Sequence, residues 1–567
     1  MSVIVLILAA LAILVGYGWY ARSIDRNIIQ PDPKKATPAK MFMDGVDFTP
    51  TSRNVLFGYQ FKSIAALGPI VGPIVAVQYG WLPALLWILL GTFFIGWVQD
   101  YSSIIIGVRN EGQTFGALSY RLISPRARSI LLVFIYCYLW LIMGAFGKLV
   151  GYNFLTNPKV PLGVLTVILM GLLAGQMTYR WKQDIILTTV ITVVVSFIGI
   201  WLGTLPGVQA IFEAINGPKD QIIFGNVTRA QFIWSIITMV ICYLGAVLPI
   251  WRWAQPINYV AFWIVFLGIL GGIIGLLVWH PGFGDFPAFR TALVPGLGPI
   301  WPILFVTIAC GAISGWHSLV SSSGTARQLE NEVDALPVGG GAMFLEMTLA
   351  TLALLTATAA FGSYSGYMEQ YGKGKASVFA VGLATFLNHI GVPKDFGVSY
   401  GVVFLTLMAL TIMYLVVRFM RVASAELLGD SIPALKNIHI GSLVAVLLSL
   451  LIVWTGAWQR IWVLFGSANQ LMASLALLLI TLWLISVGKN YTWTFIPFIF
   501  MYVTTIAALL YTAYKVFTKL AGQPTTVVIG NVIAGLLGIL LVIAALILGY
   551  DALQAVQKAG KEAQASE

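Results

Sequence analysis

The segment Leu67-Gly68-Pro69-Ile70-Val71-Gly72-Pro73 lies within an apolar run from Phe57 to Tyr79, which is long enough to span a bilayer. Each proline lacks a backbone donor and clashes with the preceding helical turn, and each glycine adds backbone freedom. Two such Gly-Pro pairs predict a helix that is broken near the middle of the membrane. Lipid cannot hydrogen-bond the freed carbonyls, so this backbone must face protein or a watery cavity. Two interpretations stay open here: a kinked packing helix, or a binding site like those that broken helices form in secondary transporters.

The composition identifies a membrane protein. Of 567 residues, 59% are hydrophobic and only 9% are charged, whereas average domains carry about a quarter charged residues. The chain is therefore predicted to be an all-α polytopic protein of the lipid bilayer. Its net charge of +11 comes from Lys and Arg scattered beside apolar runs. The positive-inside bias predicts this distribution, so no nucleic-acid partner is expected.

Motifs for enzymatic chemistry are absent from the sequence. There is no Walker loop, no Gly-x-Ser-x-Gly elbow, no His-Glu-x-x-His and no dinucleotide fingerprint in its βαβ context. Cys137, Cys242 and Cys310 fall in apolar runs without metal-type spacing. We therefore expect no enzyme, no catalytic residues, no cofactor and no metal site. With no soluble domain of any size, ATP-driven transport by this chain alone is also disfavoured.

Alternation of apolar runs with basic loops predicts about 15 membrane spans. The first run is followed, not preceded, by positive residues, so it is expected to be an anchor helix with its N-terminus outside. The predicted divisions are an anchor helix at 1–21, a cytoplasmic connector at 22–56, a first inverted repeat at 57–205, an external loop at 206–230, a second inverted repeat at 231–417, additional transmembrane helices at 440–550 and a cytoplasmic tail at 551–567.

Two segments fit this pattern poorly. The loop Arg327 to Asp334 is predicted inside, yet it is net acidic. The run at 377–390 has about 14 residues, which is marginal for a span. We expect this short segment to be re-entrant or too short to cross, because the later basic loops then fall inside.

A second Gly/Pro interruption occurs at Leu244-Gly245-Ala246-Val247-Leu248-Pro249. It lies in the sixth run counted from Phe57, which begins a second set of runs with opposite orientation. Interrupted helices at matching positions of inverted halves are a sequence pointer to a transport site. The expectation is that Gly245 and Pro249 mirror the break at Gly68 to Pro73.

The most polar apolar run contains Cys310-Gly311-Ala312-Ile313-Ser314-Gly315-Trp316-His317. His317 can titrate near neutral pH and relay a proton, or it can be a neutral residue with one buried partner. Hydroxyl oxygens can replace the hydration shell of a small cation, but they also join membrane helices routinely. The hydroxyl residues of this run recur at three- and four-residue spacing and would line one helix face: Ser314, Ser318, Ser321, Ser322 and Thr325.

Other polar groups interrupt apolar runs. Gln99 and Asp100 follow an uninterrupted apolar run, so Asp100 is a functional candidate, although a structural ion pair near Arg109 is an equal alternative. Glu346 and Lys148 lie within or near the ends of their runs, and both are expected to be structural. The paired amides Asn469-Gln470 are expected to join helices, and Asn388-His389 to line a gate or cap a segment.

Several blocks of the sequence, taken in order, resemble the carbon starvation protein A (CstA) family. They are Met43-Asp44-Gly45-Val46-Asp47-Phe48-Thr49-Pro50-Thr51, Val55-Leu56-Phe57-Gly58, Gly68 to Pro73, Val98-Gln99-Asp100-Tyr101, Cys310 to His317, Ser322-Ser323-Gly324-Thr325 and Phe465 to Gln470. One departure stands out: where the family often has two histidines, this chain has Tyr59-Gln60.

The resemblance implies a secondary carrier of the bacterial inner membrane, induced when carbon is scarce. Family members have been tied to uptake of short peptides and, in some branches, of pyruvate with protons. The family is thought to be related to the amino acid–polyamine–organocation superfamily, which implies a five-plus-five inverted core of the APC/LeuT-like type. Helix one (57–79) and helix six (231–250) would then be broken around the substrate, and helix eight (300–320) would face helix one. The resemblance thus implies that the hydroxyl-rich end of helix eight, Ser314 to Thr325, opposes Gly68 to Pro73.

The function predicted on these grounds is import of short peptides by alternating access, coupled to protons or another cation. The alternative is a pyruvate/proton symporter, and a sensor or channel is less favoured because output domains and pore motifs are missing. The predicted substrate-binding residues are Gly68, Pro69, Gly72, Pro73, Gly245 and Pro249. The predicted coupling residues are Ser314, His317, Ser321, Ser322, Thr325, Gln99 and Asp100.

Overall fold

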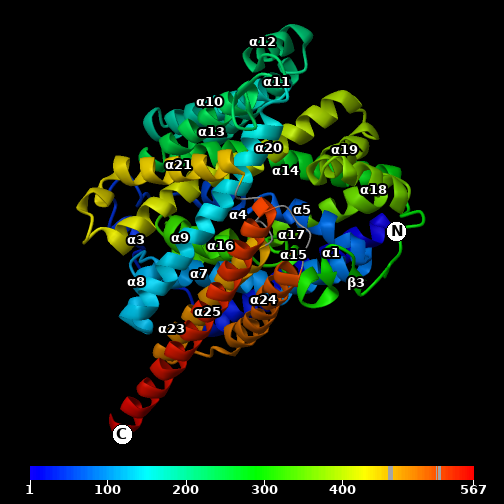
Figure 1. Cartoon of the computed structure of the whole chain (residues 1–567). Coiled ribbons are helices and arrows are strands. Elements are labelled where there is room, and N and C mark those ends of the chain that lie inside the picture. Colours follow the sequence, from blue (N-terminus) through cyan, green and yellow to red (C-terminus); the bar gives the residue numbers. More distant parts are fainter. Residues whose placement is uncertain (457–463, 519, 521–524, 567) are drawn as a thin grey trace.

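The computed structural model of the chain describes residues 1–456, 464–518, 520 and 525–566, and most of them lie in helices (Figure 1). The only sheets among these residues are two small antiparallel hairpins. They pair β1 (Ile222–Phe224) with β2 (Val227–Thr228), and β3 (Leu293–Val294) with β4 (Gly298–Pro299). The predicted all-α class is confirmed. Of the predicted range 440–550, residues 457–463, 519 and 521–524 lie outside the described part, as does residue 567 of the predicted tail.

The helices follow one another along the chain with short connections. In chain order they are α1 (Ser2–Val15), α2 (Arg22–Ile24), α3 (Pro38–Met41), α4 (Arg53–Ile64), α5 (Gly68–Ala76), α6 (Trp81–Gly91), α7 (Trp97–Arg109), α8 (Phe115–Leu122), α9 (Pro125–Lys148), α10 (Pro161–Gly175), α11 (Ile185–Leu202), α12 (Pro206–Asn216), α13 (Arg229–Val247), α14 (Ala254–Trp279), α15 (Phe305–Thr307), α16 (Gly315–Val320), α17 (Gly341–Ala359), α18 (Tyr364–Gly372), α19 (Lys375–Asn388), α20 (Lys394–Leu428), α21 (Ile438–Thr455), α23 (Phe465–Ser486), α24 (Thr492–Thr518) and α25 (Thr525–Ser566). π-Helical turns extend several of them, among them η4 (Thr92–Gly96), η7 (Ile300–Leu304), η8 (Ser321–Thr325) and η10 (Leu336–Gly340).

Thirteen helices of the described residues are long and apolar enough to cross a membrane, and α4 with α5 makes up to fourteen. The sequence predicted about 15 spans. The expected span at 300–320 accounts for the difference, because the chain there is broken into short pieces and does not form one long helix. Figure 1 shows α4, α5, α15, α16 and α17 grouped near the middle of the molecule, with α10 to α13 to one side.

The break predicted for the first core segment is present. Helices α4 and α5 meet at a bend of 46°, and Ala65 between them is extended, with ψ 97°. The break lies just before the Gly-Pro pairs, because Pro69 occupies the first turn of α5. A proline is tolerated there since the first turn of a helix does not use its backbone donors.

A second broken segment faces the first. Residues 308–314 between α15 and α16 are not helical. A Cβ at Gly68 would lie 2.5 Å from Cys310 Sγ, and one at Gly72 would lie 2.6 Å from the carbonyl oxygen of Thr307. The two breaks therefore pack directly against each other, and glycine is needed for the close approach. The hydroxyl-rich stretch Ser314 to Thr325 was expected to oppose Gly68 to Pro73. Its helical parts, α16 and η8, pack on α4, the half of the broken segment that precedes the break.

The expected interruption at Gly245 and Pro249 is not a break within a helix. Helix α13 runs without interruption through Gly245 and ends at Val247, and Pro249 follows in the turn before α14. Proline is common just after a helix because it cannot continue one. Gly245 is needed for a different contact, since a Cβ there would lie 2.5 Å from Tyr414 Cβ. The second break in the described residues lies instead at residues 308–314, in the run expected to be helix eight.

The acidic loop after η8 lies against basic residues. Its side chains form three ion pairs: Arg109 Nε to Glu332 Oε1 at 2.6 Å, Lys40 Nζ to Glu330 Oε1 at 3.9 Å, and Arg53 Nη1 to Asp334 Oδ1 at 3.7 Å. Lys40 and Arg53 belong to the connector predicted at 22–56. The net acidic charge of this loop therefore fits the basic side of the molecule, which removes one of the two misfits in the sequence pattern.

The second misfit, the run at 377–390, forms the short helix α19 of 14 residues. It follows the shorter α18 and packs on α14 and α20, at one edge of the molecule (Figure 1). That α19 does not cross the membrane stays a prediction.

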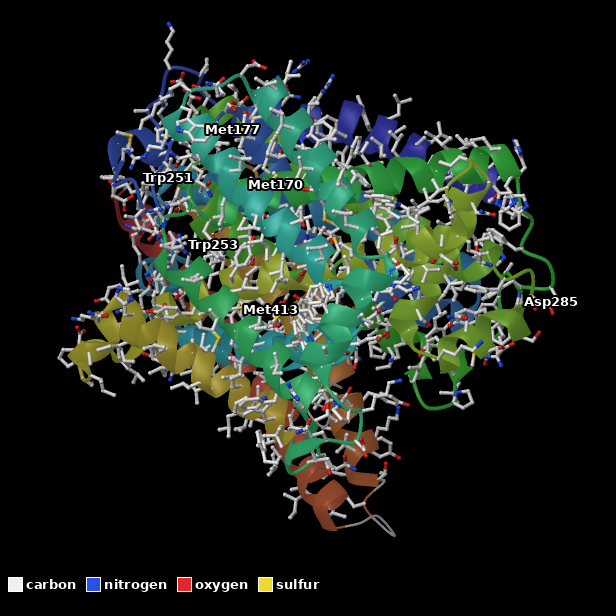
Figure 2. The ribbon with its side chains drawn as sticks, turned by 90° about the horizontal axis from the view of Figure 1, so that it is seen from above. Met170, Met177, Trp251, Trp253, Asp285 and Met413 are labelled. Carbon is white, nitrogen blue, oxygen red and sulfur yellow. The ribbon has the colours of Figure 1, made fainter. Side chains whose placement is uncertain are left out.

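The turn between α13 and α14 and the loop before β3 lie at opposite edges of the molecule. In the view of Figure 2, Trp251 and Trp253 of that turn lie at one edge and Asp285 of that loop at the other.

The contact between the two breaks can be tested at Gly72. Because the nearest atom to an added Cβ belongs to the backbone at Thr307, Gly72→Ala should lower the free energy of unfolding by about 1–3 kcal/mol, as overpacking does. Thermal unfolding of the detergent-purified protein measures this. Gly372→Ala is the matched control, since nothing lies within 4 Å of a Cβ there. Equal stability of the two variants would contradict the close contact.

Candidate functional site

Three ionisable side chains from three helices meet in the protein interior. Asp100 is on α7, His317 on α16 and Glu346 on α17, and all three are fully buried. His317 Nδ1 lies 3.1 Å from Asp100 Oδ2, and His317 Nε2 lies 3.4 Å from Glu346 Oε2. The imidazole ring thus lies between two carboxyl groups, and we call these three residues the carboxyl–histidine cluster.

Glu346 is the least satisfied member of this cluster. Neither of its oxygens, nor His317 Nε2, has a hydrogen bond among the described residues. The 3.4 Å separation therefore brings the two groups together without hydrogen-bonding geometry. A buried carboxylate without donors is costly, and protonation removes that cost. Glu346 can accept or release a proton without breaking a hydrogen bond, which suits a group that carries protons.

The predicted hydroxyl residues are divided among several partners. Gln60 of α4 donates through Nε2 to Ser321 Oγ at 2.9 Å and accepts a hydrogen bond from Thr325 Oγ1. Ser322 Oγ donates to the carbonyl of Ser318 in its own helix at 2.7 Å. Ser321 and Thr325 thus join η8 to α4. These bonds match the helix-joining alternative, and they engage Gln60 where the family often has histidine.

Side chains from other helices satisfy the non-helical backbone of the second break. Gln99 Nε2 donates to the carbonyl of Ser314 at 2.7 Å, and Ser314 Oγ donates to Asn469 Oδ1 at 3.0 Å. Trp87 Nε1 donates to the carbonyl of Ile308 at 3.1 Å, and Gln470 Nε2 donates to the same carbonyl at 3.4 Å. Irregular backbone at membrane depth requires such protein partners. Gln99 and Ser314 therefore support the break itself.

Lys62 is a further buried ionisable residue, which lies within the apolar run from Phe57 to Tyr79. It lies on α4 just before the first break and is fully buried. Its Nζ donates a hydrogen bond to Thr411 Oγ1 of α20 at 2.8 Å. The next residue, Ser63, accepts from Asn258 Nδ2 at 2.7 Å. An ionisable residue inside an apolar run is a functional candidate by default. This rule would have found Lys62, and it would have ranked Glu346 as functional where a structural role was expected from the sequence.

A small basic cavity lies between α4, η8 and α20. Its lining includes Tyr59, Ser323, Arg327 and Arg418, and its volume of about 20 Å³ has room for little more than one water molecule. The connector covers it: Asp47 Oδ1 lies 2.7 Å from Arg418 Nη1. Two further contacts hold the connector there, since the amide of Thr49 donates to the carbonyl of Arg327 and that of Ile250 to the carbonyl of Val46.

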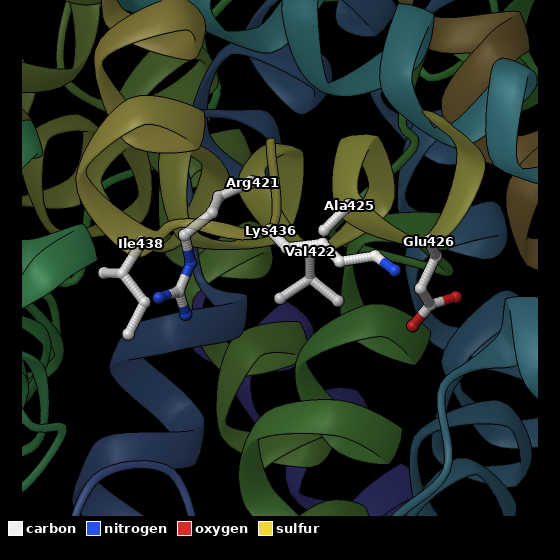
Figure 3. Close-up of a pocket in the computed structure, with 6 residues that line it drawn as sticks. All are labelled: Arg421, Val422, Ala425, Glu426, Lys436 and Ile438. Carbon is white, nitrogen blue, oxygen red and sulfur yellow. The ribbon is translucent and has the colours of Figure 1, made fainter. Parts of the chain in front are cut away.

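A wider hollow of about 290 Å³ opens beside this cavity, next to the end of α20. Figure 3 shows its six lining side chains, with the basic groups of Arg421 and Lys436 and the carboxylate of Glu426 on the same hollow. Val422 lines both spaces. The two spaces therefore lie on either side of this part of α20.

A family model described as "Carbon starvation protein CstA" matches residues 1–370 and 361–508. The chain belongs to this family. The resemblance inferred from the sequence is thereby confirmed, and the protein is a multi-pass membrane protein of a transporter family and not an enzyme.

Several CstA relatives with assigned names align over most of the chain. Peptide transporter CstA of Campylobacter jejuni is 28% identical, covering 89% of this chain and 79% of that protein. The pyruvate/proton symporter BtsT of Escherichia coli is 29% identical, covering 88% and 79%. Peptide transporter CstA of Bacillus subtilis is 27% identical, covering 96% of both proteins.

Solved structures of transporters also align with this CstA chain. A mutant of the Eremococcus coleocola manganese transporter gives a TM-score of 0.45 at 12% identity, covering 91% of this chain and 99% of that one. MhsT in complex with L-phenylalanine gives 0.41 at 15% identity, covering 89% and 99%.

The ion pair that holds the connector over the basic cavity can be tested with Asp47→Asn. Arg418 is almost fully buried, so loss of its partner should destabilise the closed arrangement. We expect a lower unfolding temperature and several-fold faster maleimide labelling of an introduced Ser323→Cys. Asp430→Asn, which removes an exposed partner of Lys436, should change neither. Unchanged labelling after Asp47→Asn would show that the connector does not close this cavity.

Proposed function

We propose that this CstA-family chain is a secondary transporter of the bacterial inner membrane that imports short peptides together with a proton by alternating access. The observation that carries the proposal is the carboxyl–histidine cluster, buried next to two broken helices. The CstA relatives named as peptide transporters support the substrate.

The substrate would bind at the first break. Among the described residues, the backbone amides of Ala66 and Leu67 have no hydrogen-bond acceptor, although both residues are buried. The N-terminus of α5 follows directly, and its dipole favours a negative group. These amides suit a carboxylate or a peptide carbonyl. Gly68 and Gly72 allow the close contact between the two breaks, and Pro69 and Pro73 shape α5. Gly245 and Pro249 lie at the end of α13, and they have no part in this proposal.

The cluster would carry the coupling proton. Helix α17, which holds Glu346, packs on α5, and α16, which holds His317, packs on α4. A change in the charge of the cluster therefore acts on both halves of the broken helix. Asp100 would hold the imidazole by its hydrogen bond to Nδ1, and Glu346 would exchange the proton. Ser314, Ser321, Ser322, Thr325 and Gln99 would maintain the helix contacts around this site.

A second candidate is pyruvate/proton symport. The relative BtsT is named for this activity, and pyruvate presents the same carboxylate to the first break as the C-terminus of a peptide does. The two candidates share the cluster and differ in how much room the open site has beyond the carboxylate.

Uptake into proteoliposomes tests the proposal. Labelled di- and tripeptides, and separately labelled pyruvate, are supplied with and without an inside-alkaline pH gradient and with and without a sodium gradient. One pH unit can support up to about tenfold accumulation of a solute that moves with one proton. Peptide accumulation driven by the pH gradient is expected. Accumulation of pyruvate alone would favour the second candidate, and accumulation driven by sodium alone, or of neither substrate, would overturn proton-coupled transport.

Glu346→Gln tests the proton carrier. The amide keeps the shape of the side chain but cannot take up the proton, so accumulation should fall to the level seen without a gradient, while exchange of labelled for unlabelled substrate continues. Glu369→Gln is the control, because that carboxylate is exposed and paired with Lys373. Wild-type accumulation by the Glu346→Gln variant would remove Glu346 from the coupling mechanism.

A further inference from the structure

The ammonium group of Lys62 has less compensation than a buried cation requires. Within the described part of the chain, no carboxylate oxygen lies within 4.0 Å of its Nζ, and its only hydrogen-bond partner is the neutral hydroxyl of Thr411. An ammonium group has three donors. A charge taken out of water is expensive unless it is paired and hydrogen-bonded, so this group is prepared for an anion that is absent from the chain itself.

We propose that Lys62 is the anchor for the carboxylate of the transported molecule, an assignment that rests on the transport function proposed above. The side chain leaves α4 just before the break whose amides at Ala66 and Leu67 lack acceptors. The Thr411 hydroxyl occupies one donor of Nζ when no substrate is bound. A carboxylate would form a charge-assisted bond there, which is roughly twice as strong as a neutral one.

Counting the charges of the interior supports this assignment. The buried ionisable groups near the two breaks are Lys62, His317, Asp100 and Glu346, all fully buried. Their charges balance when all four are ionised. A substrate carboxylate adds one negative charge and a proton on Glu346 adds one positive charge. A monoanion such as pyruvate can therefore enter with one proton without leaving a net charge in the membrane interior, which predicts one-to-one uptake for it. A zwitterionic peptide brings its own ammonium charge, so its carboxylate can bind to Lys62 without requiring the proton for charge balance.

Glu346 is not in direct contact with Lys62, and its charge acts on the ammonium group from beyond ion-pair distance. Its carboxyl group lies 3.4 Å from His317 Nε2, and no oxygen of it lies within ion-pair distance of Lys62 among the described residues. The alternative role for Lys62 is to tether α4 to α20 through Thr411. The two roles differ in their need for the Thr411 hydroxyl. A tether between α4 and α20 requires this hydroxyl, whereas an anchor for a substrate carboxylate does not.

Binding to the full-length protein in detergent tests the anchor without depending on transport. The probes are alanyl-alanine against its C-terminal amide, and pyruvate against pyruvamide, measured by thermal stabilisation over a concentration series. The wild type should bind each acid at least tenfold more tightly than its amide. Lys62→Met should abolish this preference, and Thr411→Val should keep it. Lys373→Met, which removes an exposed lysine, is the charge-matched control and should behave as the wild type.

Each result decides between the roles. If the preference for the acid over its amide survives in Lys62→Met, the anchor is overturned. If Thr411→Val and Lys62→Met lose this preference equally, the anchor is also overturned, and Lys62 is a tether between α4 and α20. Failure of the wild type to bind either acid also overturns it. The unfolding temperature without ligand confirms that Lys62→Met is folded. If Lys62-dependent binding occurs but the acids do not accumulate in proteoliposomes, the transport proposal fails and the anchor stands. If transport proceeds with an unchanged KM in Lys62→Met, the anchor fails and transport stands.

Discussion

Polar backbone groups inside a membrane need hydrogen-bond partners, and the centre of this protein is arranged around that constraint. At the second break the partners come from the chain itself, whereas at the first break the amides of Ala66 and Leu67 have no acceptor among the described residues. Two segments leave the helical conformation, at Ala65 to Leu67 and at residues 308–314. Gln99, Trp87 and Gln470 donate to carbonyls at or next to the second break. These side chains come from α6, α7 and α23, so the conformation of the break depends on three other helices.

The first break could be predicted from the sequence because its cause is local. Proline and glycine change the backbone wherever they occur, and the Gly-Pro pairs needed only to be placed within a membrane-length run. The second break has no proline within residues 308–314, and it depends on contacts with Gly68 and Gly72 more than two hundred residues earlier. No local rule identifies it. The same local rule marked Gly245 and Pro249 wrongly, since a proline just beyond a helix end resembles one within a helix.

The ionisable residues show a similar limit. Asp100 and His317 were singled out because each interrupts an apolar run, but their 3.1 Å contact joins residues 217 positions apart and is visible only in the folded chain. Glu346 was expected to be structural because a carboxyl group near a helix end can reach water. Its full burial beside His317 removes that option. Conversely, the acidic loop at Arg327 to Asp334, which contradicted the charge bias, is explained by partners on the connector and α7.

The hydrogen bonds of Gln60 suggest how the proton site and the basic side of the molecule are linked. Gln60 joins α4 to Ser321 and Thr325 of η8, and η8 also packs on α7, which holds Asp100. Ser323 of the same turn lines the cavity that Asp47 and Arg418 close. A movement of α16 and η8 that follows a change in charge at His317 would therefore act on this cavity through one continuous element. Because Gln60 cannot titrate as a histidine can, its hydrogen bonds between α4 and η8 do not themselves depend on pH.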